Sequence, residues 1–363
     1  MSLLVVTGAS AQNATTYTTT SDMTQSMVKN TVAMTAGSNT SGIVINPSDT
    51  KQKIDGFGYA ITYASCYNLL KMTAADRHKL LEQTYSVTKG YGVSYARISI
   101  GCNDFSSTEY TLCDTQGLDN FALQSDETNY VIPILKEILA INPSLKIIAV
   151  PWTCPKWMKV KSLTNLSAHD AWTDGHLNPA YRNAYARYFV KFINAMAGQG
   201  IPIYAVSPQN EPLNAGNCAS LYMPADEEAP FVQELASTFK SNNLATKIYV
   251  FDHNYDAYQY PITVFNSIGS SFSGADLVAG SAFHNYAGKS DVLDEMHKQF
   301  PNKDLMFSEA SIGTWNNGRV LSTRLVSDMN ELSLGCVKRY CSSVMVWNFM
   351  LDRDMKPNLD GGC

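Results

Sequence analysis

Charge is scarce in this chain. Only 16% of the 363 residues are charged, and the 32 acidic residues slightly outnumber the 27 basic ones. No cluster of Lys and Arg stands out, which argues against a nucleic-acid partner, because a phosphate backbone attracts grouped positive charges. A run of about 18 apolar residues is also missing, so we expect no membrane span.

Motifs for metals, nucleotides and serine nucleophiles are missing too. The six histidines and eight cysteines show neither CxxC pairs nor HExxH spacing, so we expect no metal and no cofactor. Gly-x-Ser-x-Gly and Gly-x-Gly-x-x-Gly turns are absent, which disfavours esterases and dinucleotide enzymes. Cys102 and Cys113 either bridge a short loop or remain buried free thiols, and their spacing does not decide between the two.

Aromatic residues, by contrast, are abundant. The chain has 20 Tyr and 5 Trp, and this composition suits a neutral, polar ligand. One stripe of aromatic and apolar side chains recurs at helical spacing between Tyr181 and Met196. We interpret that stripe as a helix face packed on the core rather than as a platform for a ligand.

The first 53 residues differ in composition from the rest. Residues 1–11 resemble the end of a secretory signal peptide, with an apolar stretch before Ala9-Ser10-Ala11, so we expect a secreted, periplasmic or cell-surface protein. Residues 12–41 are rich in Thr, Ser, Asn and Met without helical period, which predicts a flexible leader. Residues 42–53 hold a short predicted strand that would belong to a side β-domain.

Strand-like and helix-like stretches alternate from residue 54 to residue 363. This rhythm is typical of a parallel sheet wound with helices, and the length suits an α/β (β/α)₈ TIM barrel, which needs about 250 residues. The predicted strands are Gly56–Ala60, Tyr95–Ile100, Leu145–Val150, Pro202–Ser207, Lys247–Phe251, Leu277–His284, Leu305–Ser308 and Ser343–Phe349. The predicted helices are Thr73–Tyr85, Asn129–Ile141, Ala180–Ala197, Ala225–Ser241, Val292–Phe300 and Val320–Leu334.

Two glutamates follow strands that lie about three βα units apart. Glu211 and Glu309 both come at the carboxyl end of an apolar run, where a barrel keeps its catalytic groups. Paired carboxylates that flank one bond are the machinery of glycoside hydrolysis. Glu211 is the better candidate for the acid, because the neighbouring Asn210 can bind a sugar hydroxyl. The alternatives are a helix cap for Glu211 and a salt-bridged strand end for Glu309.

Other side chains at the strand ends are candidates for binding a sugar. Trp152, Trp315 and Trp347 can stack on a pyranose ring while the indole N–H stays wet, or they can be structural. Asp104 either accepts hydrogen bonds from sugar hydroxyls or pairs with Arg97. His284 and Tyr286 would orient the nucleophile, with a satisfied core histidine as the alternative.

Seven segments in order resemble glycoside hydrolase family 30, the glucosylceramidase-like enzymes of clan A. They are Ile54–Ala60, Arg97–Ser106, Ala149–Met158, Tyr204–Pro212, Phe283–Tyr286, Phe307–Ser311 and Trp347–Asn348. The resemblance implies retaining hydrolysis of a β-linked glycoside, with Glu211 as acid/base and Glu309 as nucleophile. It also implies a sugar subsite lined by Asp104, Trp152, Asn210, His284, Tyr286 and Trp347.

The resemblance narrows the range of expected substrates, and it shows one difference between this chain and the family. The chain is most similar to the glucosylceramidase and endo-β-1,6-glucanase branches, and expected export favours a soluble β-glucan; a β-xylosidase is a further alternative. Family members carry a β-sandwich beside the barrel, most of which is missing here, so we expect a truncated chain that ends after the eighth strand. We expect a monomer. A non-catalytic carbohydrate-binding barrel and an inverting glycosidase, with carboxyl groups about 6.5–9.5 Å apart, stay open.

Overall fold

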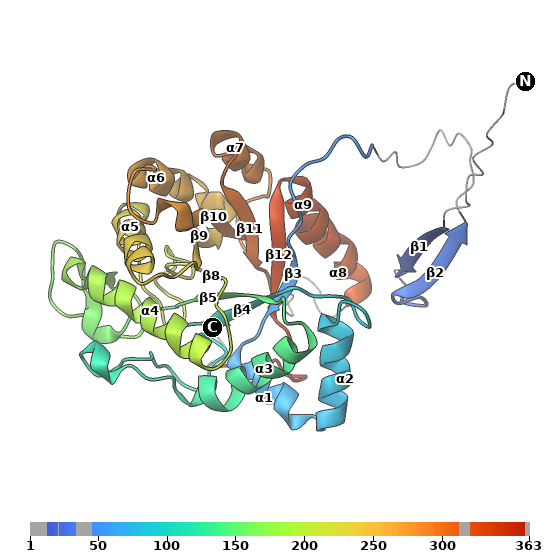
Figure 1. The fold of residues 1–363 in the computed structure, drawn as a ribbon, viewed down its shortest axis with the longest axis horizontal. Coiled ribbons are helices and arrows are strands. Elements are labelled where there is room, and N and C mark those ends of the chain that lie inside the picture. Colours follow the sequence, from blue (N-terminus) through green and yellow to red (C-terminus); the bar gives the residue numbers. More distant parts are fainter. Residues whose placement is uncertain (1–12, 21, 34–45, 312–319, 360–363) are drawn as a thin grey trace, which may run out of the picture. The chain divides into compact units, whose positions relative to one another are not determined.

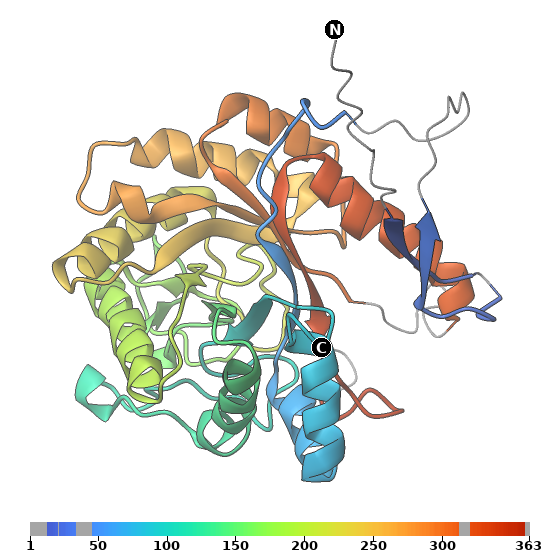
Figure 2. The ribbon, with the colours of Figure 1, turned by 45° about the vertical axis from the view of Figure 1, so that its right-hand side comes forward.

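The computed structural model describes residues 13–20, 22–33, 46–311 and 320–359. The chain divides into two compact units, one with residues 52–311 and 332–363, the other with residues 1–51 and 312–331. In the larger unit eight parallel strands close into a barrel, and helices lie around it (Figures 1 and 2). The prediction of a (β/α)₈ TIM barrel is therefore confirmed.

The barrel strands follow one another around the ring in chain order. They are β3 (Gly56–Ala60), β4 (Tyr95–Ser99), β5 (Lys146–Val150), β8 (Ala205–Val206), β9 (Lys247–Asn254), β10 (Val278–His284), β11 (Asp304–Glu309) and β12 (Cys341–Asn348). A second, antiparallel pair is formed by β6 (Lys159–Val160) and β7 (His176–Leu177). Glycine allows close packing at the start of the ring: a Cβ on Gly58 would lie 2.4 Å from the Tyr95 carbonyl oxygen.

Helices of the larger unit connect these strands. They are α1 (Tyr63–Lys71), α2 (Ala74–Tyr85), α3 (Ile132–Ile141), α4 (Arg182–Gly198), α5 (Ala225–Ser241), α6 (Gln259–Ile268), α7 (Val292–Gln299) and the short α9 (Cys336–Lys338). Thr73 caps α2 by accepting a hydrogen bond from the Asp76 N–H at 3.2 Å. The prediction missed α1 and α6. Helix propensity is low there, because α1 contains Ser, Cys and Asn and α6 contains Pro261 and β-branched residues.

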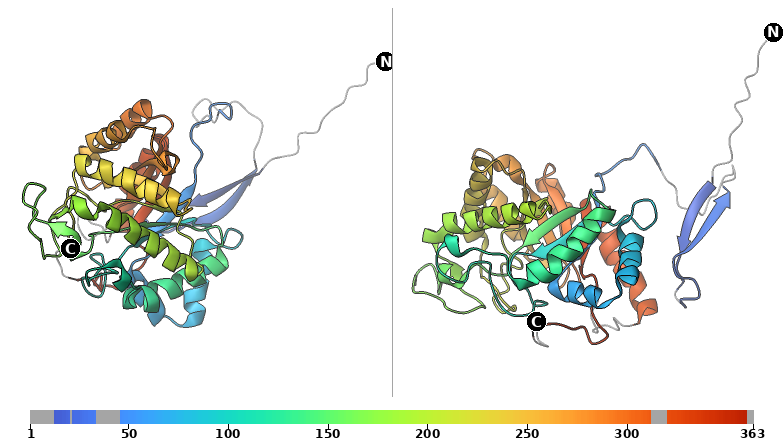
Figure 3. Two further views of the ribbon diagram at one scale, coloured as in Figure 1. Left: turned by 60° about the vertical axis from the view of Figure 1, so that its left-hand side comes forward. Right: turned by 60° about the horizontal axis from the view of Figure 1, so that its bottom comes forward.

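The aromatic stripe on α4 belongs to the core, as predicted. Tyr185, Tyr188, Phe189 and Phe192 are all buried. Helices α4 and α5 lie side by side (Figure 3), and the Tyr185 ring stacks on Phe231 of α5 at a centroid distance of 5.0 Å. The stripe therefore holds the outer helices together and does not face a ligand.

Strand β9 contains a bulge that its sequence does not announce. Phe251 and Asp252 both have positive φ, at 78° and 59°, and the register against β10 shifts at this point. The buried carboxylate of Glu228 on α5 accepts a hydrogen bond from the Phe251 N–H at 3.0 Å. Burial raises the pKa of Glu228 to about 7. The bulge places a strained backbone at the carboxyl end of the strand.

The smaller unit contains secondary structure where a flexible leader was expected. Residues 12–41 include β1 (Asn13–Thr18) and β2 (Val28–Ala33), which pair as an antiparallel hairpin. Thr, Tyr and Val favour extended backbone, and this preference outweighs the polar composition of the segment. The unit also includes α8 (Leu321–Asp328), in which Arg324 pairs with Asp328 at 2.8 Å.

Some predictions fall on residues that the structure does not describe. The signal-like residues 1–11 and most of the strand expected in residues 42–53 lie outside the described part; residues 46–53 form no strand. Cys102 and Cys113 are both buried free thiols, so they form no disulfide with each other. No helix within the described ranges is long and apolar enough to cross a bilayer.

Candidate active site

The carboxyl end of the barrel carries a buried network of charged side chains. Glu309 is the last residue of β11 and His284 is the last residue of β10, while Glu211 follows β8 in a loop. Glu211, His284 and Glu309 are 8%, 0% and 6% exposed. Buried charges require partners, so the contacts of these three residues define the site.

Arg97 ties three strands together at the centre of this network. The side chain is fully buried and donates to Glu309 Oε2 at 2.5 Å through Nη1. Its Nη2 donates to Asn210 Oδ1 at 2.7 Å and to Asp252 Oδ2 at 2.8 Å. Arg97 was predicted only as an alternative partner of Asp104, and the structure gives it these other partners. An arginine inside the apolar strand β4 is the signal that could have pointed to a functional role, but it was not used for a prediction.

His284 bridges the other glutamate to the same aspartate. Its Nδ1 lies 3.2 Å from Glu211 Oε1, and its Nε2 lies 3.2 Å from Asp252 Oδ1. Burial alone would lower the pKa of His284, but the negative charges of Glu309, Asp252 and Glu211 raise it to about 9. His284 was expected to orient the nucleophile Glu309, and it instead contacts the predicted acid.

The protonated imidazole has the opposite effect on Glu211. Burial would raise the pKa of this carboxyl, but the hydrogen bond and charge of His284 outweigh burial and lower it to about 2. Asn214 Nδ2 donates to the second carboxylate oxygen, Oε2, at 2.8 Å. Without bound sugar, the proton of this pair therefore resides on the histidine.

Tyr286 contacts the predicted nucleophile, as expected. Its hydroxyl donates to Glu309 Oε1 at 2.9 Å and lies 3.2 Å from Ser311 Oγ. Burial, followed by the charge of Glu309, raises the pKa of the Tyr286 phenol well above its usual value, so the group stays a donor. Arg97 and Tyr286 thus each hold one oxygen of Glu309.

A family model and two kinds of relative show which proteins this chain is similar to. The model described as the glycosyl hydrolase family 30 TIM-barrel domain matches residues 54–359. The chain belongs to glycosyl hydrolase family 30. A solved structure, an endo-β1,6-glucanase, is 52% identical with a TM-score of 0.90, over 97% of this chain and 77% of that one.

Curated family 30 relatives are more distant. An endo-1,6-β-D-glucanase of Trichoderma harzianum is 31% identical over 87% of this chain and 64% of its own length. The lysosomal acid glucosylceramidase of Mus musculus is 27% identical over 87% of this chain and 63% of its own length. The chain thus spans less than two thirds of the length of these relatives.

Two tryptophans form an aromatic wall beside the family 30 glutamates. The rings of Trp152 and Trp347 lie 5.4 Å apart, and the Arg97 guanidinium lies 5.1 Å and 5.3 Å from them. Only 2% of Trp152 and 6% of Trp347 are exposed, and Trp152 Nε1 is buried without a hydrogen-bond partner among the described residues. The expectation of a wet indole N–H is therefore wrong for Trp152, since the ring packs against the cation. The predicted Trp315 lies outside the described residues.

Asp104 forms no ion pair with Arg97, although the charge of Arg97 acts to lower the pKa of its carboxyl. Its Oδ1 is buried and has no hydrogen-bond partner within the described ranges. Burial, and then the charge of Glu309, raises the pKa of Asp104 to about 8. A buried carboxylic acid with an unused oxygen suits a partner with hydroxyl groups.

Backbone strain is concentrated at the same place. Glu211 has a φ of 43°, and its N–H donates to the carbonyl of Asp252 at 3.0 Å. The bulge in β9 turns two successive side chains toward the network: Asp252 contacts Arg97, and His253 Nδ1 lies 3.8 Å from Glu211 Oε1. The predicted strand Lys247–Phe251 ends just before Asp252 and His253, and these two residues were given no role from the sequence. In a regular strand their side chains would point to opposite faces.

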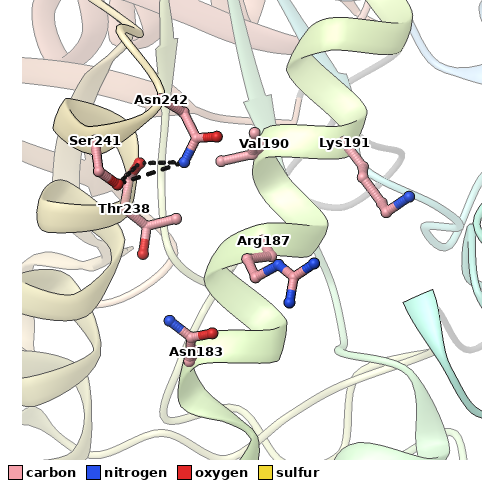
Figure 4. Close-up of a pocket in the computed structure, with 7 residues that line it drawn as sticks. All are labelled: Asn183, Arg187, Val190, Lys191, Thr238, Ser241 and Asn242. Atoms are coloured by element: carbon pink, nitrogen blue, oxygen red, sulfur yellow. Dashed lines mark hydrogen bonds between the residues drawn. The ribbon is translucent and has the colours of Figure 1, made fainter. Parts of the chain in front are cut away.

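A hollow of about 310 Å³ lies elsewhere, between α4 and α5 (Figure 4). Its lining residues are Asn183, Arg187, Val190, Lys191, Thr238, Ser241 and Asn242. This lining contains neither a carboxylate nor an aromatic ring. This hollow therefore lacks the carboxylates and aromatic rings that hydrolysis and binding of a sugar would use.

Proposed function

We propose that this chain hydrolyses β-1,6-linked glucan with retention of configuration, through a covalent glycosyl-enzyme intermediate. The observation that carries the proposal is the single hydrogen-bonded network that joins Glu211 and Glu309 through His284, Asp252 and Arg97. The 52% identity to an endo-β1,6-glucanase supports the substrate. Retention requires carboxyl groups about 5–5.5 Å apart, and this separation stays a prediction.

In the first step Glu309 attacks the anomeric carbon. Its carboxylate is oriented by Arg97 on Oε2 and by Tyr286 on Oε1. As the bond from Oε1 or Oε2 to the anomeric carbon forms, the bond to the leaving oxygen breaks and Glu211 gives that oxygen a proton. In the second step Glu211 accepts a proton from water, whose oxygen attacks the anomeric carbon and frees Glu309.

Glu211 needs a proton before the first step, and His284 can supply it. The low pKa of Glu211 in the free protein places that proton on the imidazole, across a 3.2 Å contact. A sugar that fills the mouth removes water from Glu211, and loss of water favours the neutral carboxylic acid. Substrate binding would therefore move the proton from Nδ1 to Oε1, with Asp252 holding the imidazole at Nε2.

The aromatic wall and two polar side chains are suited to the bound sugar. Trp152 and Trp347 offer flat apolar faces, which match the C–H faces of a pyranose. Asn210 turns its Oδ1 to Arg97, so its amide N–H groups remain for a sugar oxygen. Asp104 supplies the unused Oδ1 described above. Export to the periplasm, cell surface or medium stays a prediction, and it is consistent with a polymeric substrate.

The direct test is a hydrolysis screen. The wild-type chain should release short oligosaccharides from β-1,6-glucan and should act at least about tenfold more slowly on β-1,3-glucan, xylan and glucosylceramide. Glu309→Gln is the matched inactive control. Preferred cleavage of glucosylceramide would instead favour a glucosylceramidase, which is the function in the name of the mouse relative. Sugar binding without any hydrolysis would favour a binding barrel.

A further inference from the structure

The proposed reaction leaves His253, at the barrel mouth, without a task. Its side chain is 10% exposed, and its Nδ1 is buried without a hydrogen-bond partner among the described residues. That nitrogen points toward Glu211 Oε1 at 3.8 Å, which is too long for a hydrogen bond. Buried polar atoms in native proteins nearly always have a partner, so the geometry calls for an explanation.

Three potential metal ligands converge at this point. One atom each of Glu211, His253 and His284 can be chosen so that all three lie within 4.8 Å of one another. The two imidazole Nδ1 atoms lie 3.8 Å and 3.2 Å from the same oxygen, Glu211 Oε1. Ligand bonds of about 2.0–2.1 Å in a tetrahedral zinc site separate its ligand atoms by roughly 3.4 Å. The two separations from Glu211 Oε1 are therefore close to those between the ligand atoms of a zinc site.

The surroundings favour a divalent cation by charge. Glu211, Asp252 and Glu309 bring three carboxylates into the network, and Arg97 is the guanidinium that compensates one of them. A bound ion would displace the proton of His284, and with both imidazoles then neutral two negative charges would remain. A divalent ion would balance them without any change in the rest of the network.

The residues behind the ligands have the arrangement typical of zinc proteins. Metal-binding histidines commonly donate their second ring nitrogen to a carboxylate, which fixes the tautomer and the ring orientation. His284 Nε2 already lies 3.2 Å from Asp252 Oδ1, and Asp252 is held by Arg97. Glu211 Oε2 is held by Asn214 at 2.8 Å, which leaves Oε1 to the ion.

From these contacts we infer that the mouth binds zinc, or a similar borderline transition-metal ion, through Glu211, His253 and His284, and that the ion inhibits hydrolysis. An ion on Oε1 takes the oxygen that would carry the catalytic proton, so metal and substrate exclude each other. The inhibition rests on the proposed function, whereas binding of the ion does not. Local sequence spacing gave no sign of this site, because the ligands come from β9, β10 and the loop after β8.

Direct binding to the metal-free full chain tests the site independently of activity. Zinc should titrate to one tight site per chain by calorimetry, and cobalt(II) should show visible bands without a sulfur-to-cobalt transition. His253→Asn should weaken both at least about tenfold. His78→Asn makes the same change at an exposed position and should leave both unchanged. Glu211→Gln is a second ligand variant that should also weaken binding. It provides the test if His253→Asn does not fold.

Several outcomes would overturn the inference. A sulfur-to-cobalt transition would assign the ion to cysteines, and unchanged affinity in both ligand variants would place it elsewhere. If the chain hydrolyses β-1,6-glucan, zinc should raise KM without lowering kcat, and EDTA should reverse the effect. Zinc that binds at the tight site but leaves KM unchanged would separate the site from catalysis and overturn the inhibition.

Discussion

The two mouths of this barrel carry similar residue types in different surroundings. At the amino ends of the strands, Lys146 pairs with Asp55 at 2.5 Å, with side chains that are 29% and 21% exposed. At the carboxyl ends, Arg97 pairs with Asp252 at 2.8 Å, and both side chains are fully buried. The pairs resemble each other in chemistry, but only the second has been taken out of water.

The difference explains why one mouth has the properties of a site. At the amino end a single carboxylate is matched by a single ammonium group. Tyr95 adds one hydrogen bond, which its hydroxyl donates to Asp55 at 3.1 Å. The carboxyl-end network holds more carboxylates than cations, raises the pKa of His284 and lowers that of Glu211. Shifted pKa values in a buried cluster are a mark of catalytic sites, whereas a partly exposed ion pair is not.

The largest expected effect comes from replacing the carboxylate of Glu309, at the carboxyl end of β11, by an amide. The same replacement at the amino end of β11 is the control. Glu309→Gln should lower kcat on β-1,6-glucan by at least about 10³-fold, because the amide cannot form the glycosyl-enzyme bond. Asp304→Asn makes the same chemical change at the other end, where Asp304 accepts a hydrogen bond from Tyr249 at 2.7 Å. That variant should keep its turnover. Equal losses in both variants would remove the contrast between the mouths.

A second comparison concerns stability. Arg97→Met leaves Asp252 and Glu309 buried without their cation and should cost about 3–5 kcal/mol in the free energy of unfolding. Lys146→Met leaves Asp55 near water and should cost about 1 kcal/mol or less. Urea unfolding of both variants measures the two costs. Similar values would mean that burial does not distinguish the two pairs.

The pH dependence of stability should come from the carboxyl-end mouth. The pKa of His284 is raised to about 9, so its contribution is complete below pH 6.5 and is lost as pH rises through 9. The loss should be on the order of 2–3 kcal/mol. Asp55 has a lowered pKa: burial opposes the shift, and the Lys146 contact causes it. Its contribution is therefore lost only in acid.

His284→Gln isolates the histidine in that profile. The stability gap between wild type and this variant should shrink between pH 6.5 and 9. Part of the wild-type slope should survive in the variant, because Asp104 has a pKa of about 8 and also loses its proton there. A gap that stays constant over this range would show that the imidazole is neutral in the folded protein.

The smallest effect is expected from the aromatic wall. Trp347→Phe keeps an aromatic face but shortens it, so KM for β-1,6-glucan should rise about three- to tenfold with little change in kcat. Tyr204→Phe, at the amino end between Lys146 and Lys247, removes one hydroxyl and should leave KM unchanged. Steady-state kinetics of the two variants provide the check. An unchanged KM in Trp347→Phe would assign that ring to structure alone.

The sequence predicted the barrel because eight apolar runs alternate with helical patterns, of which six were recognised. It predicted Glu211 and Glu309 because a carboxylate after a buried strand is unusual. It did not predict the partners of Arg97, since pairs between strands depend on the closed ring. Asp252 and His253 were given no role, because the bulge at Phe251 changes which side chains face the mouth.

Prediction also failed where composition gave the wrong signal. The Thr-rich residues 13–33 form a hairpin, because alternating Thr, Tyr and Val side chains favour strands even in a polar segment. Helix α6 was missed because its Ile, Thr and Val residues have low helix propensity, and packing in the barrel overrides that preference. The first error arose because composition was weighed above local strand preference, and the second because a local window of sequence does not contain the packing contacts of α6.

Trapping of the covalent intermediate tests the central claim most directly. The chain should be incubated with a 2-deoxy-2-fluoro-β-glucoside that carries a good leaving group, digested and analysed by mass spectrometry. The account predicts one sugar per chain, attached to Glu309, and no label in Glu309→Gln. A sugar attached to any other residue, or rapid hydrolysis with an inverted first product and no adduct, would contradict it.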